Sequence, residues 1–368
     1  MSKSIVIKNK IGKYNKTIRV QGDKSISIRF VLLASQAIGI SRVYNLLESE
    51  DVKSSIHAVK KLGVKISKKK NYYEIIGCGL NGFNFTNNLK INAGNSGTLA
   101  RLILGLLVKS YKKIKILGDK SLSRRDFGRV ADPLKTCGVN LKTKNNCLPL
   151  SIKGSEFLRP INYFEKLGSA QVKSCLMIAA LNIPGLTKIK AKKSRNHTEI
   201  FFKKVLKIPI KILSKKKYDF IEIEGLNKYK GFDYKIPGDI SSASFFIILT
   251  ILSKNSKILI KNTNINKSRT GIIDILKKMK CKIYLKNKKT YNGEKIADIL
   301  AKSSNYIKPI NCDSKYTSRT IDEFLIIFLI ASKSKGVSYF KNLSELNKKE
   351  SKRLDIASKI LTLMGVKN

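Results

Sequence analysis

Several residue types that support common functions are scarce in this chain. Among 368 residues there is no Trp, only two His and six Cys, and no two Cys form a Cys-x-x-Cys pair. Neither a zinc site nor a disulfide framework is expected, and the reducing cytoplasm is the expected compartment. The longest apolar runs, such as Phe324–Ala331, are too short to cross a bilayer, and no apolar stretch follows Met1. We therefore expect neither a membrane protein nor a secreted one.

Acidic residues are also scarce: 25 Asp and Glu face 74 Lys and Arg, which gives a net charge of +49. One interpretation is a protein that binds a polyanion. The other is a general compositional drift toward Lys, which is spread along the whole chain. We favour drift and expect no nucleic-acid partner. The 12 Arg are more informative, because Arg forms bidentate bonds to carboxylate and phosphate that Lys cannot form.

A repeat runs through the sequence, in which a helix-like stretch ends in a short turn and leads into a strand. The turns fall at residues 63, 138, 207, 280 and 365. A hairpin-like segment of alternating polarity follows each of the first four turns. Each unit also has an earlier helix that opens at a loop rich in Gly or Ser. Three of these helices, Thr98–Val108, Val172–Leu181 and Ala243–Leu252, are apolar almost all round and should be buried.

The repeat predicts an α/β protein built from β-α-β-α-β-β units. The fifth unit stops where the earlier units enter their hairpins. A sheet that lacks its hairpin has unpaired edges, so we expect either a truncated chain or a family with a further unit.

Two loops at helix starts carry groups suited to anions. The segment 22–29 places Lys24, Ser25 and Arg29 at the start of a helix, where backbone N–H groups and cations favour phosphate or carboxylate. The segment 92–101 has glycines that allow close approach of a ligand, but a simple turn does not explain Arg101 within an apolar helix. A plain N-cap with solvated charges remains the alternative for the first loop.

Carboxylates are concentrated near the C-terminus of the sequence. Asp322 lies just before the apolar helix expected over Phe324–Ala331, and a carboxylate at a buried helix start can act as a base. Lys349 and Arg353 are four residues apart, so a helix there would place them on one face. An ordinary surface ladder of ion pairs is the alternative for that stretch. His197 is more simply explained as an orienting or structural residue than as a metal ligand.

Taken in order, these segments resemble the enolpyruvyl transferases, and specifically the EPSP synthase family. Eight collinear blocks carry the resemblance: Gly-Asp-Lys-Ser, Gly-Asn-Ser-Gly-Thr, Gly-Asp-Lys-Ser-Leu, Ser-Ala-Gln-Val-Lys-Ser, Ser-Arg-Asn-His-Thr-Glu, Pro-Gly-Asp-x-Ser-Ser-Ala, Asp-Glu and Lys-Glu-Ser-Lys-Arg. The resemblance implies an inside-out α/β barrel of two domains. One domain would comprise residues 22–237, and the other would combine residues 1–21 with 238–368 and have an incomplete last unit.

The resemblance also implies a reaction and its residues. The 5-hydroxyl of shikimate 3-phosphate would attack phosphoenolpyruvate and release phosphate, with Asp322, Glu350 and Lys24 as catalytic groups. Shikimate 3-phosphate would be bound by Lys24, Ser25, Arg29, Ser169, Ala170, Gln171, Arg195, Asp322 and Lys349. Phosphoenolpyruvate would be bound by Lys24, Asn95, Gly97, Arg125 and Arg353. No metal or organic cofactor is expected, the protein would be a monomer, and glyphosate would occupy the phosphoenolpyruvate site.

Some features depart from the family pattern. Arg125 is followed by Asp126 and Phe127 where the family usually has Pro-Met, and Lys352 stands in place of an acid. The family continues for about sixty residues more, so the unfinished repeat implies a C-terminal truncation. Two alternatives follow: an inactive or partner-dependent truncated enzyme and, less favoured, the sister transferase that acts on UDP-N-acetylglucosamine.

Overall fold

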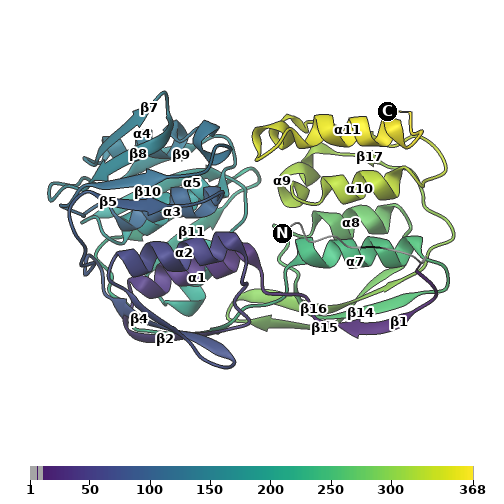
Figure 1. Ribbon diagram of the computed structural model, residues 1–368, viewed down its shortest axis with the longest axis horizontal. Coiled ribbons are helices and arrows are strands. Elements are labelled where there is room, and N and C mark those ends of the chain that lie inside the picture. The colour runs from purple at the N-terminus through teal and green to yellow at the C-terminus, as the bar shows by residue number, and fades with distance from the viewer. Residues whose placement is uncertain (1–5, 7–10, 368) are drawn as a thin grey trace.

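The computed structural model describes residue 6 and residues 11–367, and Figure 1 shows them as two lobes joined through neighbouring segments. Residues 1–5, 7–10 and 368, which the sequence analysis assigned to the second domain, lie outside the described residues. Among the described residues, no helix has both the length and the apolar character needed to span a membrane.

Four sheets share one strand order, in which an edge strand runs parallel to its neighbour and a hairpin completes the sheet. The first sheet has the order β13 (Asp233–Lys235), β2 (Ile38–Tyr44), β4 (Tyr72–Cys78), β3 (Lys65–Lys68). The second has β5 (Leu89–Asn92), β6 (Ile114–Leu117), β8 (Cys147–Lys153), β7 (Asn140–Lys144). The third has β9 (Asn162–Glu165), β10 (Leu186–Lys192), β12 (Tyr218–Glu224), β11 (Ile210–Ser214). The fourth has β1 (Asn15–Ile18), β14 (Lys257–Asn264), β16 (Glu294–Lys302), β15 (Ile283–Tyr291).

All four predicted hairpins are confirmed, since each is an antiparallel pair that follows its predicted turn. The first and fourth sheets take their edge strands from distant sequence, β13 and β1 respectively. A fifth and smaller sheet pairs only β17 (Asn311–Cys312) with β18 (Tyr339–Phe340), in parallel. The second half of the chain therefore has one four-stranded sheet and one two-stranded sheet among its described residues.

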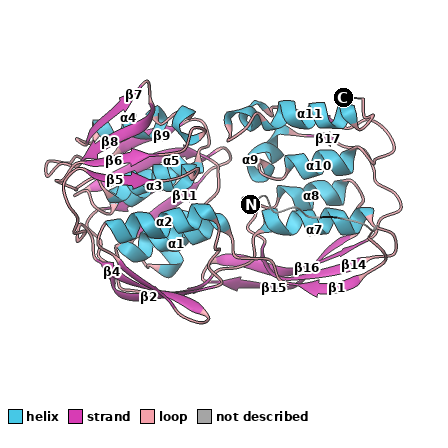
Figure 2. Cartoon of the chain, in the orientation of Figure 1, coloured by secondary structure: helices cyan, strands magenta, loops and turns pink. Residues whose placement is uncertain are grey.

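The helices lie between the sheets, with the strands largely on the outside of the first lobe (Figure 2). The first lobe contains α1 (Lys24–Ser35), α2 (Glu50–Lys61), α3 (Gly97–Leu106), the 3-10 turn η1 (Leu122–Arg124), α4 (Gly128–Thr136), α5 (Ala170–Ala180), α6 (His197–Ile200) and the π-helical turn η2 (Phe201–Val205). The second contains α7 (Ile240–Leu252), α8 (Gly271–Lys278), η3 (Ser314–Tyr316), α9 (Thr317–Thr320), α10 (Phe324–Ala331), η4 (Ser344–Lys348) and α11 (Arg353–Leu363).

Four helices begin at the Gly- or Ser-rich loops in the same way. A side-chain oxygen of the N-cap residue accepts a hydrogen bond from a backbone N–H of the first turn, which satisfies a donor that the helix itself cannot. The capping residues are Asp23 for α1, Ser96 for α3, Ser169 for α5 and Asp239 for α7. These caps fix where each helix starts, and so where its free N–H groups point.

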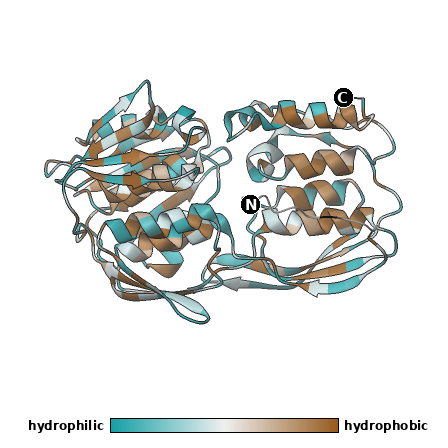
Figure 3. Cartoon of the chain, in the orientation of Figure 1, coloured by the Kyte–Doolittle hydropathy of each residue, from teal (hydrophilic) through white to brown (hydrophobic). Residues whose placement is uncertain are grey.

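Apolar side chains form two separate clusters. One runs from Ile26 to Ile236 and includes the buried faces of α1, α3 and α5, and the other contains Val20 and apolar residues from Ile240 to Leu346. Figure 3 shows the same apolar bands on the helices of both lobes. Domain boundaries at residues 22 and 237 stay our proposal.

Two expectations about the helices need correction. Helix α7 is not wholly buried, since Phe245 is 59% exposed, and neither is α10, whose Leu325 is 41% exposed. An apolar composition all round does not bury a helix when no other element covers one of its sides. Lys349 is extended rather than helical, so Lys349 and Arg353 do not share a helix face.

The chain crosses between the lobes at two adjacent segments. Gly22 and Gly238 form an antiparallel bridge, and the N–H of Asp23 donates to the carbonyl of Pro237 at 2.9 Å. Gly22 cannot be replaced without movement, because a Cβ there would lie 2.1 Å from the carbonyl oxygen of Asn45. This tight crossing places the starts of α1 and α7 next to each other.

Candidate active site

The carboxylate of Asp322 lies between two arginines. Arg195 Nη2 is 2.5 Å from Asp322 Oδ2, and Arg353 Nη1 is 3.4 Å from Oδ1. Burial would raise the pKa of Asp322, but Arg195, Lys349 and Arg269 hold the pKa far below its usual range. Asp322 is therefore ionised in this structure and can accept hydrogen bonds only.

A continuous set of polar contacts leads from Arg353 to the first lobe. Arg353 Nε donates to Glu350 Oε1 at 2.7 Å, and Glu350 Oε2 is 4.0 Å from Arg125 Nη2. Arg125 Nη2 in turn donates to Asn95 Oδ1 at 2.9 Å. The hydroxyl of Ser121 donates to the backbone carbonyl of Glu350 at 3.0 Å. The structure thus brings together Asn95, Arg125, Glu350, Arg353, Asp322 and Arg195.

The predicted helix around Lys349 is replaced by a turn that the Asn347 side chain closes. Asn347 Oδ1 accepts from the N–H of Leu354 at 2.9 Å, and its Nδ2 donates to Asp355 Oδ1. Such side-chain bonds to the backbone compete with helix formation. Lys349 reaches the neighbourhood of Asp322 from this turn. Burial lowers the pKa of Lys349, and the negative charge of Asp322 acts in the opposite direction.

Lys24 and Arg29 lie on different sides of α1. Lys24 is half exposed, and its Nζ is 3.3 Å from Asp51 Oδ2. Arg29 is 3% exposed, and its guanidinium donates to the carbonyl of Ser25 and to the hydroxyls of Thr198 and Ser174. Five residues correspond to about 500° of helix rotation, which is more than one full turn and less than two. The two side chains therefore lie on different sides of the helix. Their roles as substrate ligands stay predictions.

The start of α5 lies beside the start of α3. Ser169 caps α5, and Ala170 is its first residue. Gln171 donates to Thr98 Oγ1 at 3.0 Å and accepts from Arg101 Nη1 at 2.8 Å. Arg101 also donates to the carbonyl of Asp126 at 3.0 Å. A simple turn did not explain why Arg101 lies within an apolar helix. These contacts explain it, because Arg101 joins the start of α5 to the loop that contains Asp126.

Gly97 opens α3 directly beneath two guanidinium groups. A Cβ at this position would lie 2.9 Å from Arg101 Nη1 and 3.0 Å from Arg125 Nη1. The missing side chain therefore leaves room at a helix N-terminus between cations, which is suited to an anion. Asp126, which follows Arg125, pairs with Arg129 at 3.2 Å.

A buried cluster of charged and polar side chains near Asp322 was not predicted from the sequence. Arg269 is 3.1 Å from Asp23 Oδ2 and 3.1 Å from Asp239 Oδ1, and so joins the caps of α1 and α7. Ser241 accepts from Arg269 and donates to Glu323. Burial raises the pKa of Glu323 to about 7. The partners are far apart in sequence, so no local pattern identifies this cluster.

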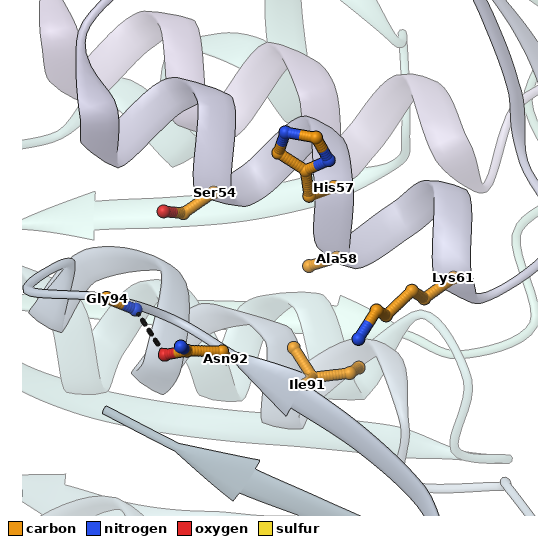
Figure 4. A pocket seen from close by; sticks show the side chains of 7 residues that line it. All are labelled: Ser54, His57, Ala58, Lys61, Ile91, Asn92 and Gly94. Atoms are coloured by element: carbon orange, nitrogen blue, oxygen red, sulfur yellow. Dashed lines mark hydrogen bonds between the residues drawn. The ribbon is translucent and has the colours of Figure 1, made fainter. Parts of the chain in front are cut away.

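A pocket of about 310 Å³ lies between α2 and β5. Its lining includes Ser54, His57 and Lys61 of α2, with Asn92 and Gly94 opposite (Figure 4). None of the predicted site residues lines it. Among the described residues, no cluster of three or more His, Cys, Asp or Glu is arranged to hold a metal ion.

The fold is that of the enolpyruvyl transferases. An enolpyruvyl transferase from Streptomyces tendae superposes with a TM-score of 0.68 at 12% identity, over 88% of this chain and 74% of that one, a likeness of fold alone. An EPSP synthase from Acinetobacter baumannii superposes with a TM-score of 0.83 at 32% identity, over 96% of this chain and 79% of that one. These matches confirm the predicted inside-out α/β class.

Sequence comparison defines the family. The model of EPSP synthase (3-phosphoshikimate 1-carboxyvinyltransferase) matches residues 8–368. A 3-phosphoshikimate 1-carboxyvinyltransferase of Ruthia magnifica is 38% identical over 95% of this chain and 79% of its own length. One of Vesicomyosocius okutanii is 37% identical over 100% of this chain and 83% of its own length. The chain belongs to the EPSP synthase family.

These matches also bear on the expectations left open. The family match, which extends to residue 368, does not bear out the expected truncation, and the chain covers 79% and 83% of the lengths of the two relatives. Nothing in them favours an inactive enzyme or a transferase that acts on UDP-N-acetylglucosamine. The resemblance to the EPSP synthase family is confirmed.

Proposed function

We propose that this protein transfers the enolpyruvyl group of phosphoenolpyruvate to the 5-hydroxyl of shikimate 3-phosphate and releases phosphate, a step toward aromatic amino acids. Family membership supports the proposal. The observation that carries it is the set of contacts from Asn95 through Arg125, Glu350 and Arg353 to Asp322, because it combines cations of both lobes with carboxylates of the second.

The reaction needs a base, an acid and anion-binding groups. Asp322 accepts the proton of the 5-hydroxyl while the hydroxyl oxygen attacks C2 of phosphoenolpyruvate. Glu350, with Lys24, delivers a proton to C3 and removes one when the tetrahedral intermediate breaks its C2–O bond to phosphate. Arg125 and Arg353 hold the anionic oxygens throughout.

Substrate binding also activates the base. In this structure Asp322 is held by Arg195 and Arg353, which makes it a weak base. The dianionic phosphate of shikimate 3-phosphate and the carboxylate of phosphoenolpyruvate compete for these guanidinium groups. When the arginines turn to the substrates, the pKa of Asp322 rises, and the carboxylate can take the hydroxyl proton.

The remaining predicted ligands complete the two subsites. Ser25, Ser169, Ala170 and Gln171, at the starts of α1 and α5, offer hydroxyl, amide and backbone N–H groups to shikimate 3-phosphate. Lys24, Arg29, Arg195 and Lys349 supply positive charge. Asn95 and Gly97 border phosphoenolpyruvate at the start of α3. We further propose a cytoplasmic monomer that uses no metal or organic cofactor.

Phosphate release by the purified chain tests the proposal. We expect release only when both substrates are present, together with a product whose mass equals shikimate 3-phosphate plus the enolpyruvyl group. Hydrolysis of phosphoenolpyruvate alone, or no release from a cooperatively folded protein, would contradict the proposed function.

A further inference from the structure

The loop that carries Arg195 is held from the second lobe at consecutive residues. Arg195 contacts Asp322, as described above. Two residues further, His197 Nδ1 lies 2.6 Å from Glu294 Oε1, and both side chains are almost completely buried. The contact with Glu294 joins the start of α6 to the hairpin of β15 and β16, which are distant in sequence.

Glu294 is ionised and fully engaged. Burial would raise its pKa, but His197 and Asn266 lower the pKa below its usual value overall. Its second oxygen accepts from Asn266 Nδ2 at 3.0 Å and from Asn264 Nδ2 at 3.3 Å. A buried carboxylate that accepts hydrogen bonds from three donors fixes their positions more firmly than a neutral acceptor would.

The residue between Arg195 and His197 belongs to the same network. Asn196 Oδ1 accepts from Asn266 Nδ2 at 2.9 Å and from Ser268 Oγ at 3.3 Å. The hairpin turn also packs closely here, since a Cβ on Gly293 would lie 2.6 Å from Lys204 Cγ. The second lobe therefore contacts the loop through three polar bonds, one from the hairpin and two from Asn266 and Ser268, and the hairpin turn packs against η2.

We propose that Glu294 is a positioning residue that fixes Arg195 for substrate binding, by holding His197 and Asn266 in place. The inference rests on the proposed function, because it takes Arg195 as a ligand of shikimate 3-phosphate. Binding groups lose effect when they shift by about 1 Å, so the anchors at Asn196 and His197, directly after Arg195, have a direct consequence for affinity.

Glu294→Gln tests the role with little change in shape. The amide presents a donor where the carboxylate accepted, so it opposes either His197 or the Asn266 amide. We expect the KM for shikimate 3-phosphate to rise about tenfold, the scale of one hydrogen bond to a charged group. The KM for phosphoenolpyruvate should change less than about twofold, because its proposed ligands lie elsewhere.

Asp298→Asn is the matched control. Asp298 lies on the same strand β16, is also buried, and accepts from Asn262 N and Asn287 Nδ2, both at 2.8 Å. Among the described residues, neither of these hydrogen bonds reaches residues 194–197. If Glu294→Gln and Asp298→Asn lose thermal stability to the same extent, the loss reflects removal of a buried carboxylate and not the positioning of Arg195. A change in the KM for shikimate 3-phosphate confined to Glu294→Gln reports positioning.

A double variant identifies the path of the effect. If Glu294 acts through Arg195, adding Glu294→Gln to Arg195→Lys should raise the KM for shikimate 3-phosphate by less than about twofold more. A full tenfold further rise would mean that Glu294 acts independently of Arg195, and would overturn the proposal.

Hydrogen exchange separates this proposal from the proposed function. Amides of residues 194–198 should exchange faster in Glu294→Gln than in the parent protein or in Asp298→Asn. An active parent enzyme whose KM and exchange are alike in both variants would overturn the role of Glu294. An inactive parent would instead overturn the proposed function, and the exchange rates would still decide whether Glu294 fixes the loop.

Discussion

Helices of similar composition are buried to different extents in the two lobes. Leu104 in α3 is fully buried between the sheets of the first lobe, whereas Leu249 in α7 is 40% exposed. Among the described residues, the first lobe has three four-stranded sheets, and the second has one four-stranded and one two-stranded sheet. Burial is therefore set by the elements around a helix, and its hydropathy alone does not determine it.

The two lobes also contribute different chemistry. The first lobe supplies capped helix starts and the arginines Arg125 and Arg195, which suit anions. The second supplies carboxylates whose pKa values are shifted in opposite directions, Asp322 downward and Glu323 upward. The comparison predicts that substitutions of Arg125 and Arg195 act mainly on binding, and that substitution of Asp322 acts on proton transfer.

The largest effect is expected for Asp322→Ala. Removing a general base costs about 10²- to 10⁴-fold in rate, so kcat should fall by that factor. Phosphate release with both substrates measures it. Asp313→Ala, at an exposed residue of the same part of the chain, should keep full activity. An equal kcat in the two variants would remove Asp322 from the mechanism.

A pair of leucines tests the difference in burial. Leu104→Ala should destabilise the protein by about 2–5 kcal/mol, because it leaves a cavity in a closed core. Leu249→Ala should cost only about 0.5 kcal/mol, the usual scale of a surface substitution. Urea unfolding of both variants measures the difference. Equal losses would mean that the exposed side of α7 is covered in solution.

Glu323, in the buried cluster around Arg269, should make the free energy of unfolding depend on pH. The folded-state pKa of Glu323 is raised to about 7 from its ordinary 4.5, so its favourable contribution is complete below pH 4.5 and is lost as the pH rises through 7. Glu323→Gln stays neutral, so its stability relative to the parent should increase between pH 5 and 8, by at most about 3 kcal/mol. Unfolding at the two pH values, with exposed Glu345→Gln as control, measures the shift. A pH-independent difference would contradict it.

A smaller effect on activity than that of Asp322→Ala is expected for Gly97→Ala. The added methyl group displaces the guanidinium ends of Arg101 and Arg125, which can move without unfolding the protein. We expect the KM for phosphoenolpyruvate to rise about tenfold, equivalent to about 1.4 kcal/mol. Inhibition by glyphosate, expected for the parent enzyme, should weaken at least as much. Gly12→Ala, where a Cβ meets nothing within 4 Å, is the control. Unchanged inhibition would place glyphosate elsewhere.

Local signals in the sequence predicted the helix starts and the hairpins well. Ser96 and Ser169 cap the helices they precede, and α10 begins and ends where the apolar run Phe324–Ala331 does. These features depend on neighbouring residues alone, so sequence patterns contain them.

Contacts between distant residues could not be predicted in the same way. The pairing of His197 with Glu294 and the burial of Arg29 depend on how the units close around one another. The expected helix at Lys349 failed because the Asn347 side chain binds backbone groups that a helix would use. In both cases side chains form hydrogen bonds or ion pairs that the spacing of residues in the sequence does not predict.

Arginines of both lobes hold Asp322 until substrate binds. Carbon-13 NMR of the Asp322 carboxyl group, assigned with Asp322→Asn, tests it directly. In the free protein the resonance should stay that of the ionised form from pH 8 down to about 3.5, and shikimate 3-phosphate should raise the apparent pKa. Titration near the ordinary value of 3.8 in the free protein would contradict the contacts with Arg195 and Arg353.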